Sequence, residues 1–307
     1  MLRYMARRGL QTVPVIFMIS VLVFGMLHLL PGDPVLALIG DAVVSAETIE
    51  QLRQAYGLND PLPVQYWRFA SKAVQGDFGR SIRTRVPVIE SIVTMMPATI
   101  ELALAGLGIA VVLGTILGVT AALRQNTWVD SVSMVVALVG VSMPNFWLGL
   151  VLIIVFAFNL RWFPSIGRGT PAHLVLPAIA LGVRAAATIA RLTRSSMLEV
   201  LRQEYILTAR AKGLSERVVV YRHALKNALV PVVTVIGLQF GGMLGGAVVI
   251  ETVFSRQGVG QLAVAAIQSH DFPLVQGTVL LSALMYLTVN LIVDGAYALI
   301  DPRIRYS

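Results

Sequence analysis

The sequence predicts an all-α integral membrane protein with six transmembrane helices and a helical extracytoplasmic segment between the first two. Hydrophobic residues make up 56% of the 307 residues and charged residues 13%, and the mean hydropathy is +0.77. Six apolar runs are long enough to cross ~30 Å of hydrocarbon, which takes about 20 helical residues each. The basic residues cluster beside these runs, as in membrane proteins. We therefore expect residues 1–307 to form a single transmembrane domain.

The first predicted span follows three arginines. Its apolar run is too long for a secretory signal, and HLLPGDP offers no small-residue cleavage site, so we interpret it as an uncleaved anchor. Pro144, Pro177 and Pro231 lie in or near other spans and are expected to kink them. The six spans are predicted near residues 9–30, 98–123, 132–158, 174–194, 228–252 and 276–300.

The outer segment, residues 31–97, is predicted to be helical and not a disordered linker. Apolar periodicity favours helices over Ser45–Gln54 and Pro61–Val74, with Asp60 as the cap of the second helix and Gly76 beyond its end. Two interpretations of this segment stay open. It is a structural cap over the membrane domain, or a landing surface for a protein that delivers the solute.

Charge asymmetry predicts that both termini lie inside. Lys and Arg number eight from Arg191 to Lys226, against three in the two short outer segments. Loops rich in Lys and Arg remain in the cytoplasm. The polar loop of residues 195–227 is therefore expected on the cytoplasmic side.

This loop contains the longest polar and basic stretch between hydrophobic runs. A short helix is predicted from Tyr205 to Lys212, and Gly213 can adopt the left-handed conformation that closes it. Ser215 can cap a second helix, and Glu216 suits the positive end of that helix. The two helices would meet at a sharp joint.

The side chains of the first helix favour a docking surface. Ala209 and Ala211 are small, so another protein could approach the helix backbone closely. Arg210 and Lys212 would place charges at the rim of that contact.

Several stretches carry a specific resemblance. TARAKGLS followed by HALKNALVPVVT is similar to the cytoplasmic loop of permease subunits of bacterial ABC importers, in the dipeptide, oligopeptide, glutathione and nickel branch. LPGDP, QGDFG and DPRIR extend the resemblance over nearly the whole chain. The general importer motif Glu-Ala-Ala-x-x-x-Gly would place Leu207, Thr208 and Ala209 at its first three positions, so only Ala209 and Gly213 match. The glutamate of the general motif thus has no counterpart at Leu207, and Glu204 does not replace it.

The resemblance implies a type I-like ABC importer permease in the bacterial cytoplasmic (inner) membrane. Its partners would be a second permease subunit, usually a distinct homologous chain, two ATP-binding subunits inside, a solute-binding protein outside, and membrane lipid. Whether the pore is a hetero- or homodimer stays open, as does the choice among dipeptide, oligopeptide, glutathione and nickel chelate. The residues implied to couple to the ATPase are Glu204, Tyr205, Thr208, Ala209, Arg210, Ala211, Lys212, Gly213 and Leu214.

The chemistry of the chain favours transport over catalysis. The phosphate-binding pattern GxxxxGK[ST] is missing, so ATP hydrolysis is expected in partner subunits. The four histidines lack metal-site spacing, and neither a metal nor a cofactor is predicted. Aromatic residues are not interleaved with the basic ones, which argues against nucleic acid. An ion-coupled secondary carrier is the alternative, but clear repeated halves with midplane ionisable residues are missing.

Four charged residues fall within the predicted spans: Glu101, Arg184, Glu251 and Asp294. Such charges cost several kcal/mol unless they face a cavity or a partner. The two glutamates lie near span ends, where contact with interfacial water is expected. Arg184 is deeper and is our candidate for the translocation path, with a structural pair to Asp294 as the alternative.

Gly237, Gly241 and Gly245 recur every four residues in the fifth predicted span. Such spacing gives a small-residue face for close helix packing. Packing within the subunit and packing against a second permease both stay open.

Overall fold

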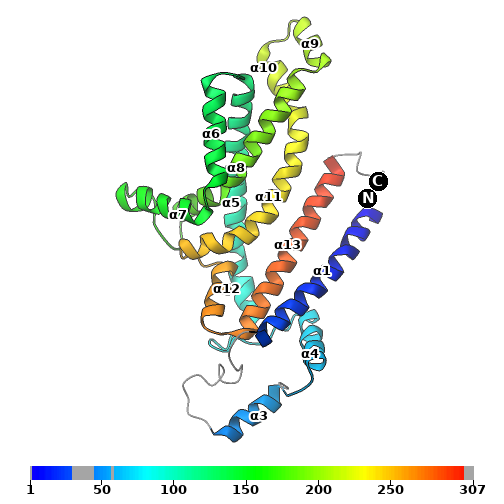
Figure 1. The fold of residues 1–307 in the computed structure, drawn as a ribbon, viewed down its shortest axis with the longest axis vertical. Helices are drawn as coiled ribbons and strands as arrows, with labels where there is room; N and C mark the ends of the chain where they lie inside the picture. Colours follow the sequence, from blue (N-terminus) through cyan, green and yellow to red (C-terminus); the bar gives the residue numbers. More distant parts are fainter. Residues whose placement is uncertain (1, 30–44, 57–58, 301–307) are drawn as a thin grey trace. The chain divides into compact units, whose positions relative to one another are not determined.

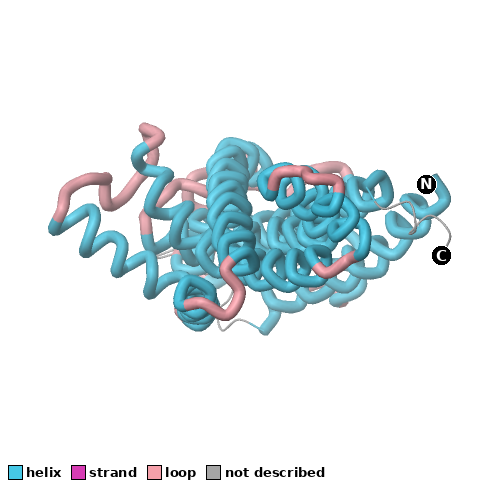
Figure 2. The backbone as a smooth tube through the Cα atoms, turned by 90° about the horizontal axis from the view of Figure 1, so that it is seen from above, coloured by secondary structure: helices cyan, strands magenta, loops and turns pink. Residues whose placement is uncertain are grey.

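The computed structural model describes residues 2–29, 45–56 and 59–300. The described residues form helices joined by loops and turns, with no strand among them (Figure 2). Contacts divide the chain into one unit over residues 99–256 and 289–300 and another over residues 2–98 and 257–288. The motifs LPGDP and DPRIR and the Asp294 side chain lie outside what is described.

The expected membrane spans are present, with one difference. Five helical segments are long and apolar enough to cross a membrane, and a bent pair of helices raises the number to six. The five are α1 (Leu2–Leu29), α5 (Val88–Leu123), α8 (Ala172–Leu201), the run from α10 (Glu216–Val218) through η2 (Val219–Ala224) and α11 (Leu225–Val253), and α13 (Phe272–Ile300).

The third predicted span, residues 132–158, is not one continuous helix. Helix α6 (Trp128–Ser142) and the run α7 (Asn145–Leu152) plus η1 (Ile153–Asn159) meet at 105°, and Figure 1 shows α7 turning sharply away from α6. Met143 has an extended backbone at φ −78° and ψ 129°. The ring of Pro144 disfavours a helical conformation at the preceding residue and removes a backbone donor. The expected kink is therefore a full break.

In the first unit, α8 is the helix on which the others pack. It contacts α6, α7 and α11. Small residues bring α5 very close to it: a Cβ built on Gly182 would lie 2.5 Å from the Gly106 carbonyl oxygen. Gly114 and Gly118 are similarly tight, with Cβ positions 2.7 and 2.6 Å from backbone oxygens of α8. Such close backbone approach is what small residues provide in membrane helices.

In the second unit, the predicted outer helices are present as α3 (Ala46–Tyr56) and α4 (Leu62–Val74). Gly76, just beyond α4, has φ +79°, as a helix end commonly requires. Asp60 does not cap α4, because Pro61 occupies that position without a side-chain cap. The Asp60 carboxylate instead accepts a 2.8 Å hydrogen bond from Arg68.

A buried carboxylate organises the loop that follows α4. Asp271 precedes α13 and accepts hydrogen bonds from the Ser81 hydroxyl and from the backbone N–H of Ile82, at 2.5 and 3.1 Å. Asp271 is itself buried. Phe78 of the QGDFG motif packs on the neighbouring apolar cluster, and α12 (Val259–Gln268) contributes to the same cluster. The motif thus has a structural role in this unit.

Candidate functional site

The polar loop folds as predicted at its joint. Helix α9 covers Glu204–Ala211, and Gly213 has φ +77°. Ser215 stands before α10 but makes no side-chain cap. Glu216 instead accepts a 2.7 Å hydrogen bond from Arg210, which joins the two helices across the turn. Figure 1 shows α9 and α10 together at one end of α8 and α11.

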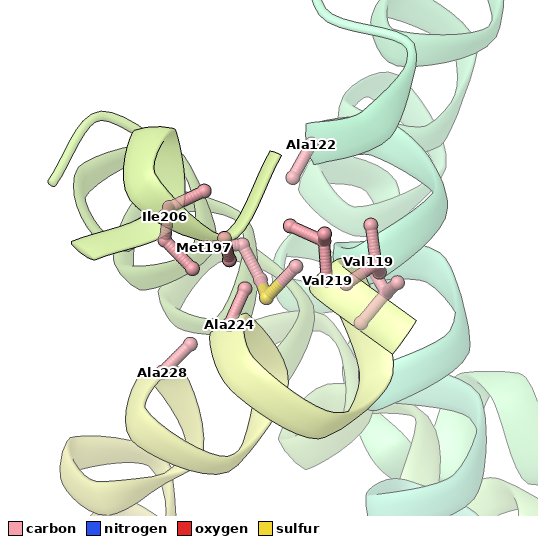
Figure 3. Packing of buried hydrophobic residues seen from close by; sticks show 9 residues of the cluster. Val119, Ala122, Met197, Ile206, Val219, Ala224 and Ala228 are labelled. Atoms are coloured by element: carbon pink, nitrogen blue, oxygen red, sulfur yellow. The ribbon is translucent and has the colours of Figure 1, made fainter. Parts of the chain in front are cut away.

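One side of α9 faces the protein's own core. Ile206 and Ala209 are buried in an apolar cluster with Met197 and Val219 (Figure 3). Residues 206 and 209 are three apart, which places them on one helical face. The expectation that Ala209 leaves room for another protein is therefore wrong, because its methyl group packs inside the chain.

The opposite side of α9 is open. Leu207 is 57% exposed, and Ala211 one turn further and Leu214 beyond the helix are exposed too. The sequence interpretation counted Leu214 but missed Leu207 as a surface residue. Helical periodicity could have found it, since Ile206 and Ala209 define an inward face and Leu207 projects away from it.

The remaining predicted coupling residues surround this apolar surface. Tyr205 is anchored, because its hydroxyl accepts a 2.7 Å hydrogen bond from the Asn227 side chain. Thr208 donates to the carbonyl of Glu204 within the helix, at 3.0 Å. The six other exposed residues of the predicted nine are Glu204, Tyr205, Thr208, Arg210, Lys212 and Gly213, of which all but Gly213 carry a polar side chain.

Helix α8 presents an open polar face, which we call the open face of α8. It consists of Arg184, Thr188, Arg191 and Ser195; Thr188 is half-buried and the other three are exposed. Intervals of three and four residues place all four on one side of the helix. Neither arginine forms an ion pair with any residue that the structure describes.

Arg194 does not belong to the open face of α8. Its Nε and one terminal nitrogen donate to the two carboxylate oxygens of Asp130 on α6, at 2.6 and 2.7 Å. Asp130 also accepts from the Asn126 backbone N–H at 3.1 Å. Bidentate pairing of this kind fixes both position and orientation. Arg194 therefore ties α8 to α6.

Beyond Arg194, the end of α8 borders a polar hollow of about 470 Å³. Its lining includes Ser195 of the open face together with Glu199 and Arg202. The open face thus continues into a polar recess beside the start of α9.

The two intramembrane glutamates differ from each other, and only Glu251 departs from the expectation of contact with interfacial water. Glu251 is 0% exposed and accepts a 2.6 Å hydrogen bond from the Thr99 hydroxyl, so it does not reach interfacial water. Glu101 is partly exposed and accepts from Arg256 at 2.6 Å and from Arg168 at 3.5 Å. The Arg256 side chain is 1% exposed. Burial lowers the pKa of the Arg256 guanidinium, while the charge of Glu101 opposes that shift.

Gly237, Gly241 and Gly245, predicted to form one packing face, differ in how far they are buried. Gly241 is buried and Gly237 half-buried, but Gly245 is exposed, and a Cβ there would meet nothing within 4 Å. Among the glycines that the structure describes, the close approaches to backbone oxygens are those between α5 and α8. Among the described residues, no group of three His, Asp or Glu side chains could hold a metal.

Comparison with known proteins places the chain in a family. Residues 114–306 match the binding-protein-dependent transport system inner membrane component, and residues 1–103 match the N-terminal part of such membrane components. The chain is 45% identical over 307 residues to the glutathione transport system permease protein GsiC of Escherichia coli and to that of Shigella dysenteriae. In both cases the alignment covers 100% of each chain.

Solved structures support the fold. The inward-facing MetNI methionine ABC transporter aligns with a TM-score of 0.56 at 19% identity, over 68% of this chain and 96% of that chain. An amino acid ABC transporter with histidines aligns with a TM-score of 0.53 at 15% identity, over 70% and 94% respectively. The chain therefore belongs to the binding-protein-dependent transport system inner membrane component family, and it is a membrane-spanning permease subunit of an ABC importer.

Proposed function

We propose that this permease moves small peptide-like solutes that carry carboxylates, with glutathione, dipeptides and oligopeptides as candidates, and that the open face of α8 lines their path. The observation that carries the proposal is the pair Arg184 and Arg191, exposed on one side of a membrane helix without an ion-pair partner among the described residues. A cation in hydrocarbon costs several kcal/mol, whereas water in a cavity removes most of that cost.

The chemistry of the open face suits such a solute. A guanidinium donates two parallel hydrogen bonds to a carboxylate. Arg184 and Arg191 are seven residues apart, so about 10 Å separates their positions along the helix. Thr188 and Ser195 add hydroxyl groups that can pair with peptide N–H and C=O groups. Named relatives transport glutathione, a tripeptide with two carboxylates, which supports the same solute class.

The proposed assembly contains two permeases, two ATP-binding subunits and an extracytoplasmic solute-binding protein. The second permease would be a distinct homologous chain that completes the cavity beside the open face of α8. ATP binding would draw the cytoplasmic loops together, and the cavity would then open outward. The ion-coupled carrier is not favoured, because membership of the family points to ATP as the energy source.

Coupling would use the exposed side of α9. Leu207, Ala211 and Leu214 offer an apolar contact, while Arg210 and Lys212 lie at its edge. The buried side, Ile206 and Ala209, would transmit the force to the core around Met197. Enlarging Ala211 should therefore obstruct docking, whereas enlarging Ala209 should disturb the protein's own packing.

The proposed location is the bacterial cytoplasmic membrane with both termini inside, residues 31–97 outside and residues 195–227 in the cytoplasm. Because the sequence has no cysteine, single cysteines are easily interpreted. An impermeant thiol reagent on intact cells should label Asp60→Cys and leave Lys212→Cys unlabelled. Outside labelling at position 212 would overturn this orientation.

Reconstituted uptake tests the solute class. Proteoliposomes with both permeases, the ATP-binding subunits and the binding protein should accumulate labelled glutathione or dipeptide only with ATP. A dipeptide with an amidated C-terminus should be transported more slowly than the same peptide with a free carboxylate. Equal transport of the two, with the binding protein saturated by each, would exclude carboxylate recognition. Uptake driven by an ion gradient without ATP would contradict the importer mechanism.

A further inference from the structure

Helix α4 packs against α1 within a stretch that is apolar enough to cross a membrane. The apolar window of α1 runs from Arg8 to Gly25. Tyr66 of α4 hydrogen-bonds the hydroxyl of Ser20, with 2.8 Å between the two oxygens. Its ring also packs edge-on against Phe17, with 6.1 Å between ring centroids. Ser20 and Phe17 lie about 7 and 12 Å from Gly25 along the helix axis, at 1.5 Å per helical residue.

Further aromatic contacts extend this packing toward the end of the window. Phe24 lies 5.6 Å from Tyr66 and 6.1 Å from Phe69, measured between ring centroids. One face of α4 is thus fixed against α1. Because those α1 residues belong to the apolar window, hydrocarbon that surrounds α1 would also reach α4.

The rest of the α4 surface divides into two sides. Trp67 is 74% exposed and Val74 90% exposed, and Val64 is exposed beside them. These three lie about 80–160° around the helix from Tyr66, at ~100° per residue. Arg68 and Lys72 lie further round, about 200–240° from Tyr66. One side is therefore apolar and aromatic, and the other is basic.

This three-sided pattern suits a helix in the membrane interface. Such helices place Trp and aliphatic side chains toward the acyl chains and basic side chains toward the headgroups. On α1, Met18 and Leu22 are exposed as well, on a helix long enough to span the membrane. If α4 were surrounded by water, such a large exposed apolar surface would be unusual.

We propose that α4 is embedded in the lipid leaflet at the C-terminal end of α1, with Val64, Trp67 and Val74 against acyl chains and Lys72 among the headgroups. The partner of this surface is phospholipid. In the orientation proposed above this leaflet is the outer one, although the embedding itself does not depend on that orientation or on the transported solute. The helix then anchors the segment before α5 to the bilayer.

Paired spin labels on the two sides of α4 test the proposal. Single-cysteine variants Val74→Cys and Lys72→Cys, about 160° apart on the same helix, would carry a nitroxide in full-length protein reconstituted in phospholipid vesicles. Collision with oxygen, which concentrates in the bilayer, and with a water-soluble nickel chelate is measured for each. Val74→Cys should favour oxygen, and Lys72→Cys should favour the nickel chelate.

Trp67 supplies a second readout that needs no change on α4. With Trp128, Trp147 and Trp162 replaced by Phe, phospholipids with brominated acyl chains should quench Trp67 and aqueous iodide should not. Dominant nickel collision at Val74→Cys, or dominant iodide quenching of Trp67, would overturn the embedding. If nickel or iodide reaches these positions and the solute-binding protein then blocks that access, the apolar side of α4 is a protein docking surface instead. Transport activity enters neither readout, so failure here is distinct from failure of the proposed solute path.

Discussion

The two sides of α8 differ in whether their arginines are paired with a carboxylate. On the packed side, glycine and alanine let α5 approach to backbone contact, and Arg194 is matched by both oxygens of Asp130. On the open face, Arg184 and Arg191 have no ion-pair partner among the described residues. A paired arginine fixes a helix in place, whereas an unpaired one remains available to a ligand. The comparison separates the arginine that builds the subunit from those that we assign to the solute.

Helix α9 repeats the contrast on a smaller scale. Ala209 and Ala211 are two residues apart and equal in size, yet Ala209 is buried and Ala211 exposed. The first belongs to the core shown in Figure 3, and the second belongs to the proposed contact with the ATP-binding subunit. Changes on the packed sides should therefore reduce stability, and changes on the open sides should reduce transport.

The largest effect is expected from the ion pair on the packed side. Asp130→Ala leaves Arg194 without its carboxylate. Because Asp130 is buried but Arg194 is 26% exposed, the cost should be lower than the ~3–5 kcal/mol that is typical of a fully buried pair. Thermal unfolding in detergent should show a clearly lower midpoint. Ser131→Ala, at an exposed neighbouring position, serves as the control and should not shift it. An unchanged midpoint for Asp130→Ala would show that the pair does not hold α6 to α8.

On the open face, Arg184→Gln should leave stability unchanged and impair transport. A hydrogen bond to a charged group contributes ~1.5–3 kcal/mol, equivalent to about ten- to hundredfold in transport efficiency. ATP-driven uptake in proteoliposomes measures this, and Arg184→Lys should retain more activity because it keeps the charge. Normal uptake by Arg184→Gln, or failure of this variant to assemble with the second permease, would contradict the assignment.

Gly182→Ala tests the close contact between α5 and α8 by adding one methyl group. Gly182→Ala places a Cβ 2.5 Å from the Gly106 carbonyl oxygen, so backbone must move. Overpacking of this kind typically costs ~1–3 kcal/mol. Gly108→Ala is the matched control on α5, because a Cβ there meets nothing within 4 Å. Equal unfolding midpoints for the two variants would show that the contact between α5 and α8 has room for the added methyl group.

The two alanines of α9 give the smallest expected effects, since the loop can relax. Ala209→Trp should lower the unfolding midpoint, because it overfills the protein's own core. Ala211→Trp should keep that midpoint but weaken docking by ~1–3 kcal/mol, about ten- to hundredfold. Co-purification of the ATP-binding subunit measures docking. Normal co-purification and normal ATP hydrolysis with Ala211→Trp would remove the docking role from this surface.

Local patterns in the sequence predicted much of this fold. Apolar run lengths located the spans, turn residues located α3 and α4, and Gly213 marked the joint after α9. Each of these features depends on residues that are neighbours in the chain. The bend at Pro144 was expected as a kink, but its 105° angle depends on how α7 packs on α8 and α11.

Pairs of side chains that lie far apart in the chain could not be predicted from the sequence. Arg194 meets Asp130 across 64 positions, and Glu251 meets Thr99 across 152. Nothing in the local periodicity distinguishes Arg194 from Arg191, because partners on other helices decide which side chain is satisfied. The same reason explains Ala209, whose inward direction follows from the cluster around Met197 and not from its small size.

The most direct test of the solute path is thiol accessibility along α8. In the cysteine-free chain, Thr188→Cys and Ser195→Cys place a thiol on the open face, and Ala187→Cys places one on the packed side. In the assembled importer, a water-soluble methanethiosulfonate reagent should modify the first two and block uptake, with protection by transported solute, and should leave the third unmodified. Failure to modify both open-face positions, while Lys212→Cys reacts in the same sample, would contradict a solute path along α8.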